Sequence, residues 1–319
     1  MTTRNVLARR EFLGRAAAAG TGCLLGTRLL GPSRAQAAPE AKDGFRVGIY
    51  TRPWDRCDYR VALDAIAEAG FQHAGLMTTN TDGRRLVIEA GLDVDVCQKI
   101  GEEVRSRGLS VPSVYGSSIP VAKSLEAGIE GMRRLIDNCA AAGARSLLMG
   151  GIGNEKLYDA YYKAIAETCD YAAEKNLPIT VKPHGGLNAT GAQCRKCIEM
   201  VGHENFSLWY DPGNIYFYSD GKLDPVDDAA TVDGLVRVGL CVKDFTMSTE
   251  GGKIQKDVWV TPGTGMVDFA AVLARLREGG FTAGDLVIEC VTRPDPDDLA
   301  AILAEAKKAR AFVEGLIAG

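Results

Sequence analysis

The sequence predicts an α/β protein built as a single (β/α)8 TIM barrel that follows an N-terminal signal peptide. From residue 45 onward, short apolar runs alternate with longer segments of helical periodicity. Eight strand candidates can be counted, and each is followed by a segment with helical periodicity. Such alternation favours a parallel sheet, and eight repeats in about 275 residues match the size of a closed barrel.

The predicted elements follow one another in strict order along the chain. Strands are expected where apolar, β-branched or aromatic residues form short runs, and helices where apolar residues recur every three to four positions. The predicted strands are 45–50, 71–77, 109–116, 144–151, 178–183, 206–211, 237–244 and 285–290. The predicted helices are 60–70, 94–108, 123–143, 155–176, 191–202, 225–234, 267–280 and 297–319.

A doubly wound open sheet is the alternative fold. It would usually carry a Gly-rich nucleotide-binding turn after an early strand. Here "GIYTRPW" follows the first strand, and "GGIGNE" after the fourth has the wrong spacing of glycines and reads as a tight turn. No linker interrupts the alternation of strands and helices, so residues 38–319 are predicted to form one domain.

The N-terminus resembles a twin-arginine export signal. Arg9 and Arg10 precede Phe12 and Leu13, and an alanine-rich apolar run then leads to the small-residue stretch "AQAA". Residues 1–37 are therefore predicted to be a signal peptide, and the mature protein to be periplasmic or secreted. An amphipathic N-terminal helix, or lipidation at Cys23, are alternatives. The apolar run is too short and too interrupted to predict a membrane span.

Composition narrows the partners. The chain has 319 residues, 46% of them hydrophobic, and its net charge of −4 comes with no basic tract beyond the N-terminus, which argues against nucleic acid. Most of the nine cysteines are expected to be buried small hydrophobes. Cys194 and Cys197 form a C-x-x-C on a predicted helix, with no second pair to complete a zinc site. The oligomeric state stays open, a homo-oligomer included.

Polar residues end four consecutive predicted strands. The fifth strand ends at Lys182 and His184, the sixth at Asp211, the seventh at Cys241 and Lys243, and the eighth at Glu289. In a barrel of this kind the active site lies at the C-terminal ends of the strands. Charges rarely end buried strands without partners, so we expect these side chains to converge.

The motifs "DPGN", "CVKD", "PGTGMVDF" and "VIEC", in this order, resemble the sugar phosphate isomerase/epimerase family of xylose isomerase-like TIM barrels. The resemblance covers roughly residues 45 to 315. It implies a divalent cation, commonly manganese or magnesium, held by a glutamate, an aspartate, a histidine and a glutamate at the ends of strands five to eight. Asp211 and Glu289 match the aspartate and the last glutamate.

Two ligand positions depart from the family pattern. Lys182 stands where the family has a glutamate, and Cys241 where it has a histidine. An ammonium has no lone pair for a cation, and a thiolate prefers zinc to magnesium or manganese. Asp211, Cys241 and Glu289, with or without His184, could bind zinc, or the site could hold no metal.

The departures also change the expected chemistry. Because Lys182 removes one of the two carboxylates that family epimerases use, two-base epimerisation is disfavoured. One base and one fixed positive charge still allow enolisation, aldose–ketose isomerisation or β-elimination, with Lys182 stabilising an enolate oxygen and Glu289 or His184 moving the proton. A Schiff base on Lys182 is a further alternative. If Lys182 instead only pairs with Asp211 and Glu289, the site would be catalytically dead.

These observations predict a sugar isomerase- or epimerase-type enzyme acting on a free or oxidised keto sugar. A keto-sugar or glycoside lyase or dehydratase, and a non-catalytic carbohydrate-binding barrel, are the alternatives. The candidate substrate-binding residues are Tyr50, Arg52, Asn214, Lys243 and Arg293. Tyr50, Arg52 and Trp54 could stack on a sugar face, while Trp54 and Trp259 could equally be packing residues.

Overall fold

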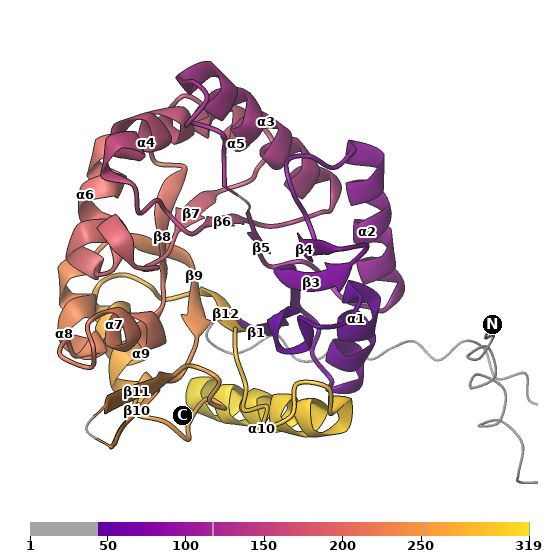
Figure 1. Ribbon diagram of the computed structural model, residues 1–319, viewed down its shortest axis with the longest axis vertical. Coiled ribbons are helices and arrows are strands. Elements are labelled where there is room, and N and C mark those ends of the chain that lie inside the picture. The colour runs from indigo at the N-terminus through magenta and orange to yellow at the C-terminus, as the bar shows by residue number, and fades with distance from the viewer. Residues whose placement is uncertain (1–43, 117, 252, 319) are drawn as a thin grey trace, which may run out of the picture. The chain divides into compact units, whose positions relative to one another are not determined.

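The computed structural model describes residues 44–116, 118–251 and 253–318. The predicted signal peptide, with Arg9, Arg10 and Cys23, lies outside the described residues. Within them, parallel strands surround a central axis and helices cover the outside of the sheet (Figure 1). The predicted fold class is confirmed.

The barrel sheet has eight strands in the order β2-β1-β12-β9-β8-β7-β6-β5, and every pair in it is parallel. Isolated parallel bridges between His73 and Ser110 and between Leu76 and Val114 join its two ends. The strands are β1 (Phe45–Tyr50), β2 (Ala74–Gly75), β5 (Val114–Tyr115), β6 (Leu147–Met149), β7 (Ile179–Val181), β8 (Phe206–Tyr210), β9 (Val236–Val242) and β12 (Gly284–Ile288). Each lies in or overlaps a predicted strand.

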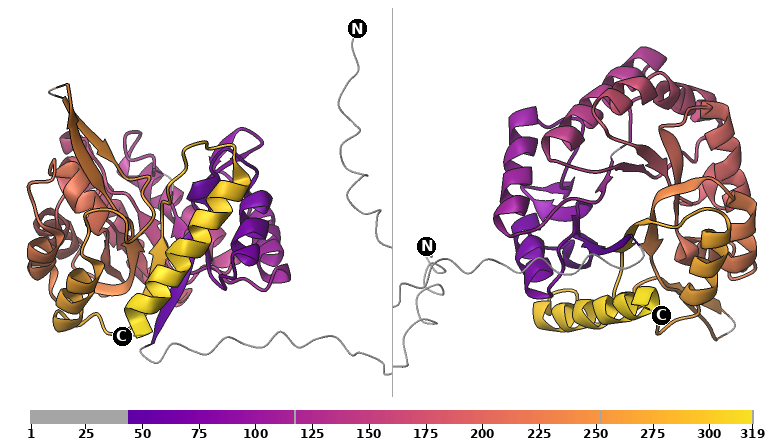
Figure 2. Two further views of the ribbon diagram at one scale, coloured as in Figure 1. Left: turned by 90° about the horizontal axis from the view of Figure 1, so that it is seen from below. Right: turned by 180° about the vertical axis from the view of Figure 1, so that it is seen from behind.

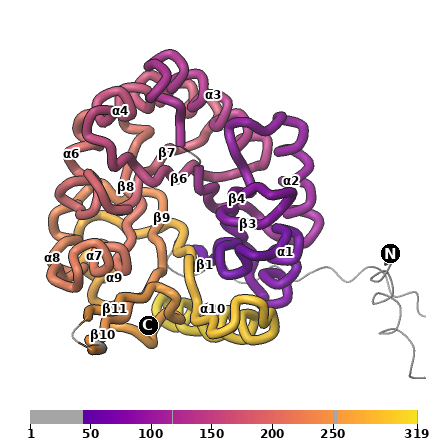
Figure 3. The backbone as a smooth tube through the Cα atoms, viewed as in Figure 1, coloured from indigo at the N-terminus to yellow at the C-terminus, as the bar shows by residue number. Residues whose placement is uncertain are grey.

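The helices form the outer layer, and the tube in Figure 3 follows the chain around this ring. They are α1 (Tyr59–Glu68), α2 (Val94–Ser106), α3 (Leu125–Ala141), α4 (Tyr158–Ala166), α5 (Cys169–Glu174), α6 (Gly191–Val201), α7 (Pro212–Tyr218), α8 (Pro225–Ala229), α9 (Phe269–Glu278) and α10 (Leu299–Ala318). Several start at side-chain caps, including a capping box of Thr190 and Gln193 on α6.

One predicted helix needs correction, and one observed helix was not predicted. The single helix expected at 155–176 is α4 and α5, because the Thr168 hydroxyl donates to the carbonyls of Ala164 and Ile165 where the first helix ends. The short helix α7 was not predicted. It starts at Pro212, directly after the N-cap Asp211.

Two hairpins that the sequence did not predict also flank the barrel. β3 (Thr78–Thr81) pairs with β4 (Arg84–Leu86), and β10 (Thr246–Glu250) pairs antiparallel with β11 (Lys253–Asp257). The second hairpin leaves the barrel just after β9 and extends past the helices (Figure 2). Its strands were missed because their sequence is mostly polar.

An aromatic layer fills the inside of the barrel below the C-terminal strand ends. Tyr50 and Trp209 are both fully buried there, together with Met77, Leu148, Cys241 and Val287. Glycines make the room: a Cβ on Gly239 would lie 2.4 Å from the Trp209 ring, and one on Gly75 would lie 2.3 Å from the Tyr50 ring. The barrel interior is therefore packed, as is usual for this fold.

A separate charged group lies at the other end of the barrel. The buried Asp285, near the start of β12, accepts hydrogen bonds from Arg46 (2.8 Å) and Arg145 (2.8 Å). His73 lies beside Ser110, which Arg145 also contacts, and burial followed by Arg145 lowers the pKa of His73 to about 4. This group is distinct from the residues at the C-terminal strand ends.

The described cysteines are all unpaired thiols. Cys194 and Cys197 are buried on α6, and the Cys197 thiol donates to the Cys194 carbonyl at 3.0 Å. Among the described residues, none of the helices combines the length and the apolar character that crossing a membrane requires.

Candidate active site

The polar residues predicted to converge do lie together at the C-terminal ends of four adjacent strands. Lys182 follows β7, Asp211 follows β8, Lys243 follows β9 and Glu289 follows β12. The side chains of Lys182, Asp211 and Glu289 are 0% exposed and that of Lys243 is 3% exposed. Four charges are thus buried in one cluster directly above the aromatic layer.

Each lysine bridges both carboxylates. The Lys182 ammonium lies 2.5 Å from Glu289 Oε2 and 3.4 Å from Asp211 Oδ2. The Lys243 ammonium lies 2.7 Å from Glu289 Oε1 and 3.1 Å from Asp211 Oδ2. Such contacts compensate the cost of burying the charges, and they explain why lysines can end these strands at all.

Glu289 accepts three hydrogen bonds and forms an ion pair with Lys243. Lys243 and Arg52 bind Oε1, the latter at 2.9 Å, while Lys182 and the Cys241 thiol, at 3.1 Å, bind Oε2. Burial alone would raise the pKa of Glu289, but the neighbouring cations outweigh it and hold the pKa well below its usual range. Glu289 is therefore a carboxylate with a cation on each oxygen, and a weak base in this arrangement.

The "DPGN" motif links this cluster to α7. Asp211 caps the helix by accepting from the Asn214 N–H at 3.0 Å, and its other oxygen binds the lysines. The Asn214 side chain donates to the Pro183 carbonyl at 2.6 Å and accepts from Lys243 at 3.0 Å. Gly213 is required here because a Cβ would lie 2.6 Å from the Lys243 carbonyl oxygen.

Arg52 forms one side of the rim. It lies in the 3-10 helix η1 (Arg52–Trp54) after β1, and its side chain is 26% exposed. The Trp259 ring lies 5.2 Å from the Arg52 guanidinium and 3.4 Å from that of Arg293. Arg293 in turn pairs with Asp55 at 2.6 Å. Arg52 is thus the member of the cluster that reaches solvent.

His184 is half-buried at the rim and lies between two aromatic rings. The ring centroid of Tyr115 is 6.1 Å away and that of Tyr218 is 6.0 Å away. Burial, and then Lys182 and Lys243, lower the pKa of His184 to about 3. The imidazole is therefore neutral at physiological pH and adds no charge to the site.

Tyr50 and Trp54 do not line the site. Their exposed fractions are 0% and 1%, and Tyr50 belongs to the aromatic layer together with Cys241. Neither ring has an exposed face on which a sugar could stack, which corrects the interpretation from the sequence. Of the predicted substrate-binding residues, Arg52 reaches the rim, Lys243 and Asn214 lie in the cluster, and Arg293 is paired with Asp55.

Tyr115, Tyr218 and Asp244 were missed by the sequence analysis. Tyr115 lies one position before the end of the predicted strand 109–116, so the rule applied to the other strand ends could have found it, whereas Tyr218 lies on the unpredicted α7. Asp244 faces away from the cluster and accepts from the N–H groups of Gly263, Gly265 and Val267. It holds the loop that follows the β10–β11 hairpin.

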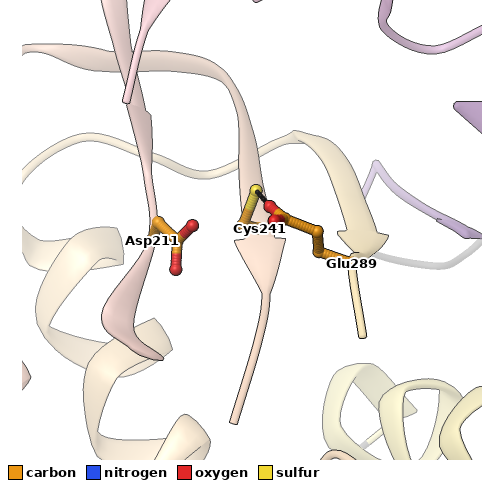
Figure 4. A group of neighbouring side chains, drawn as sticks. All are labelled: Asp211, Cys241 and Glu289. Atoms are coloured by element: carbon orange, nitrogen blue, oxygen red, sulfur yellow. Dashed lines mark hydrogen bonds between the residues drawn. The ribbon is translucent and has the colours of Figure 1, made fainter. Parts of the chain in front are cut away.

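Asp211, Cys241 and Glu289 have ligand atoms within 4.8 Å of one another (Figure 4). This set does not fit a divalent cation as arranged. Two ammonium groups already bind the carboxylate oxygens that would face the ion. Burial keeps the pKa of the Cys241 thiol well above its usual value, so the sulfur is a hydrogen-bond donor to Glu289 rather than a ligand.

Comparisons with known proteins identify the family. Residues 63–312 match the xylose isomerase-like TIM barrel family, and the chain belongs to it. No curated protein sequence matches the chain. Solved structures share the fold at low sequence identity.

An L-ribulose 3-epimerase is 17% identical with a TM-score of 0.63, over 86% of this chain and 94% of that one. D-allulose 3-epimerase from Methylomonas sp., in complex with D-allulose, is 16% identical with a TM-score of 0.63, over 86% and 97%. A xylose isomerase-like TIM barrel protein from Mycobacterium smegmatis, in complex with magnesium, is 14% identical with a TM-score of 0.66, over 86% and 96%.

Proposed function

We propose that this protein is a sugar isomerase- or epimerase-type enzyme that acts on a keto sugar through an enediolate-like intermediate. The observation that carries the proposal is the pair of lysine ammonium groups fixed between two carboxylates at the C-terminal ends of the strands. In this fold, catalytic groups sit at that position. Structural similarity to keto-sugar epimerases supports the substrate class.

Lys182 supplies the positive charge that the intermediate needs. Enolisation moves negative charge onto the carbonyl oxygen, and a fixed ammonium in a site of low dielectric stabilises that oxyanion without reorganising. Lys182 is held from two sides, by Asp211 and Glu289, so its position is defined before substrate binds. Asp211 thus acts as a positioning residue.

Glu289 is the candidate base, but it must first lose some of the groups that donate hydrogen bonds to it. Its Oε1 faces the rim, because Arg52 binds that oxygen. When substrate oxygens replace Oε1 as the acceptors for Arg52 and Lys243, the pKa of Glu289 rises towards its usual value. Oε1 can then take the proton from the carbon next to the carbonyl, and the same carboxyl group, now protonated, can return it.

The test is exchange of carbon-bound hydrogen with D₂O, followed by NMR over a panel of free keto sugars. We expect exchange with at least one of them, and a loss of about a hundredfold or more in Lys182→Met and Glu289→Gln, in line with the loss of a charged transition-state contact. Added chelator should leave the rate unchanged. Exchange that persists in Lys182→Met would contradict the assigned role.

A non-catalytic carbohydrate-binding barrel is the second candidate, and the complete burial of Lys182 and Glu289 favours it. It predicts that sugars bind while no carbon-bound hydrogen exchanges in any of them. A lyase or dehydratase would use the same enolate, and it would show exchange together with an unsaturated product that absorbs in the ultraviolet.

We further propose that the protein works in the periplasm, since Arg9 and Arg10 precede an apolar run and a small-residue cleavage region. Free and oxidised sugars are the substrates expected there. Replacing both arginines by lysine should retain the protein in the cytoplasmic fraction, and unchanged export of that variant would contradict the assignment.

A further inference from the structure

We infer that the substrate of this site is an acidic sugar, one that carries a carboxylate besides its carbonyl group. The inference rests on the proposed function and names its substrate class. It comes from the balance of charge in the cluster and from where the unbalanced charge lies.

The cluster has one positive charge in excess. Three cations, Arg52, Lys182 and Lys243, share two carboxylates, those of Asp211 and Glu289. The other polar groups of the cluster and its rim are neutral, namely the Cys241 thiol, the Tyr115 phenol and His184. Contacts with both carboxylates compensate the burial of the two lysines, so the excess charge falls on Arg52 and favours an anion that arrives with the ligand.

Neighbouring charges do not remove the excess. Arg293 reaches the same rim, but Asp55 binds it with two contacts, of 2.6 and 3.3 Å, so that pair adds nothing. The carboxylate of Asp244 points away from the cluster and is bound by backbone N–H groups of the following loop. Neither group is placed to compensate Arg52.

The excess charge lies where a ligand would enter. Lys182 and Lys243 are covered, whereas the side chain of Arg52 is 26% exposed. Among the contacts of the described residues, the Arg52 guanidinium donates only through Nη1, to Glu289. A guanidinium has five N–H donors, and a carboxylate can bind two of them side by side.

The rest of the rim suits the neutral part of a sugar. Around His184 the rim offers an uncharged imidazole and the phenol groups of Tyr115 and Tyr218. A ligand carboxylate on Arg52, with hydroxyl groups towards these residues, would place the middle of the sugar over the lysines. The same carboxylate would draw Arg52 away from Glu289 and so help to free the base.

The experiment compares sugars that differ only in one terminal group. L-Sorbose and 5-keto-D-gluconate form one pair, D-glucose and D-glucuronate another, and in each pair a CH₂OH is replaced by a carboxylate. Binding to the full-length mature protein is measured by isothermal titration calorimetry, with acetate as an anion that has no sugar part. We expect the acid of at least one pair to bind about tenfold to a hundredfold more tightly than its neutral partner, as for a charge-assisted hydrogen bond.

Variants of Arg52 test the assigned contact. In Arg52→Gln the preference for the acid should vanish, and in Arg52→Lys, which keeps the charge, part of it should remain. Arg56→Gln is the matched control, because Arg56 belongs to an exposed pair with Asp297 and such pairs contribute little. This control should keep the full preference.

Each other outcome overturns the inference. Equal or tighter binding of the neutral sugars would show that the site does not select an anion, and acetate binding as tightly as the acids would show an anion site without sugar recognition. Absence of binding by both acids, or a preference that survives in Arg52→Gln, would contradict the contact. The exchange assay tests the proposed function separately. Hydrogen exchange in neutral sugars alone would support the proposed function and refute the acidic substrate class. Binding of the acids without hydrogen exchange would support an acidic ligand and contradict the proposed enzyme.

Discussion

Replacing Lys182 by glutamate should turn the lysine-bridged cluster into one that requires a cation. The variant removes the ammonium that lies 2.5 Å from Glu289 and 3.4 Å from Asp211, and adds a third carboxylate beside them. Arg52 and Lys243 remain, so the cluster changes from one excess positive charge to one excess negative charge. Glutamate is also the residue that the family resemblance implies at this position.

The magnitude follows from the contacts. Two unit charges 4 Å apart interact by about 4 kcal/mol at an effective dielectric constant near 20. Leaving a buried charge without its partner costs about 3–5 kcal/mol of folding free energy, which is our expectation for Lys182→Glu without metal. Lys182→Met should cost less, about 1–3 kcal/mol, because two cations then face two carboxylates and no net charge is left.

Urea unfolding of both variants, with and without Mn²⁺, is the assay. Only Lys182→Glu should be stabilised by the ion, by about 2.7 kcal/mol when free metal is about a hundredfold above its dissociation constant. Equal loss of stability in the two variants, or a Mn²⁺ effect as large in the wild type, would refute the view that the lysines occupy the place of a cation.

Three further predictions concern stability. The pKa of His184 is about 3 in the folded protein, against an ordinary 6.5. Between pH 6.5 and pH 3 the imidazole is therefore protonated in the unfolded chain and neutral in the folded protein, so stability should fall as pH decreases through this range. In His184→Asn this loss, at most about 1.4 kcal/mol per pH unit, should be reduced when urea midpoints at about pH 7 and about pH 4 are compared. Gly239→Ala should destabilise the protein by about 1–3 kcal/mol through its clash with Trp209, while Gly91→Ala, whose Cβ would have nothing within 4 Å, should be nearly neutral; similar midpoints would contradict the packing argument. Asp244→Asn should cost about 1.5–3 kcal/mol and speed amide exchange in the loop that Asp244 holds, so unchanged exchange there would show that the loop does not depend on this carboxylate.

The sequence was sufficient for the barrel because strand and helix periods alternate so regularly, and because polar residues end the strands. It predicted that Lys182, Asp211, Lys243 and Glu289 would converge, since parallel strands place their C-terminal ends at one edge. The double bridging by the lysines could not be predicted, as it depends on side-chain conformations set by tertiary packing. Helix α7 was missed because its seven residues begin with Pro and Gly and end in three aromatic residues, so they show no helical period.

The aromatic layer of Tyr50 and Trp209 makes the two ends of the barrel independent of each other. Glu289 lies four positions after Asp285 along the chain, about 13 Å at the usual rise of a strand, and packed rings fill the space between. Effects of mutations more than about 7–10 Å apart usually add. The charged group around Asp285 can therefore be redesigned for thermal stability while the cluster around Glu289 is altered separately, and the effect of each change can be measured without correcting for the other.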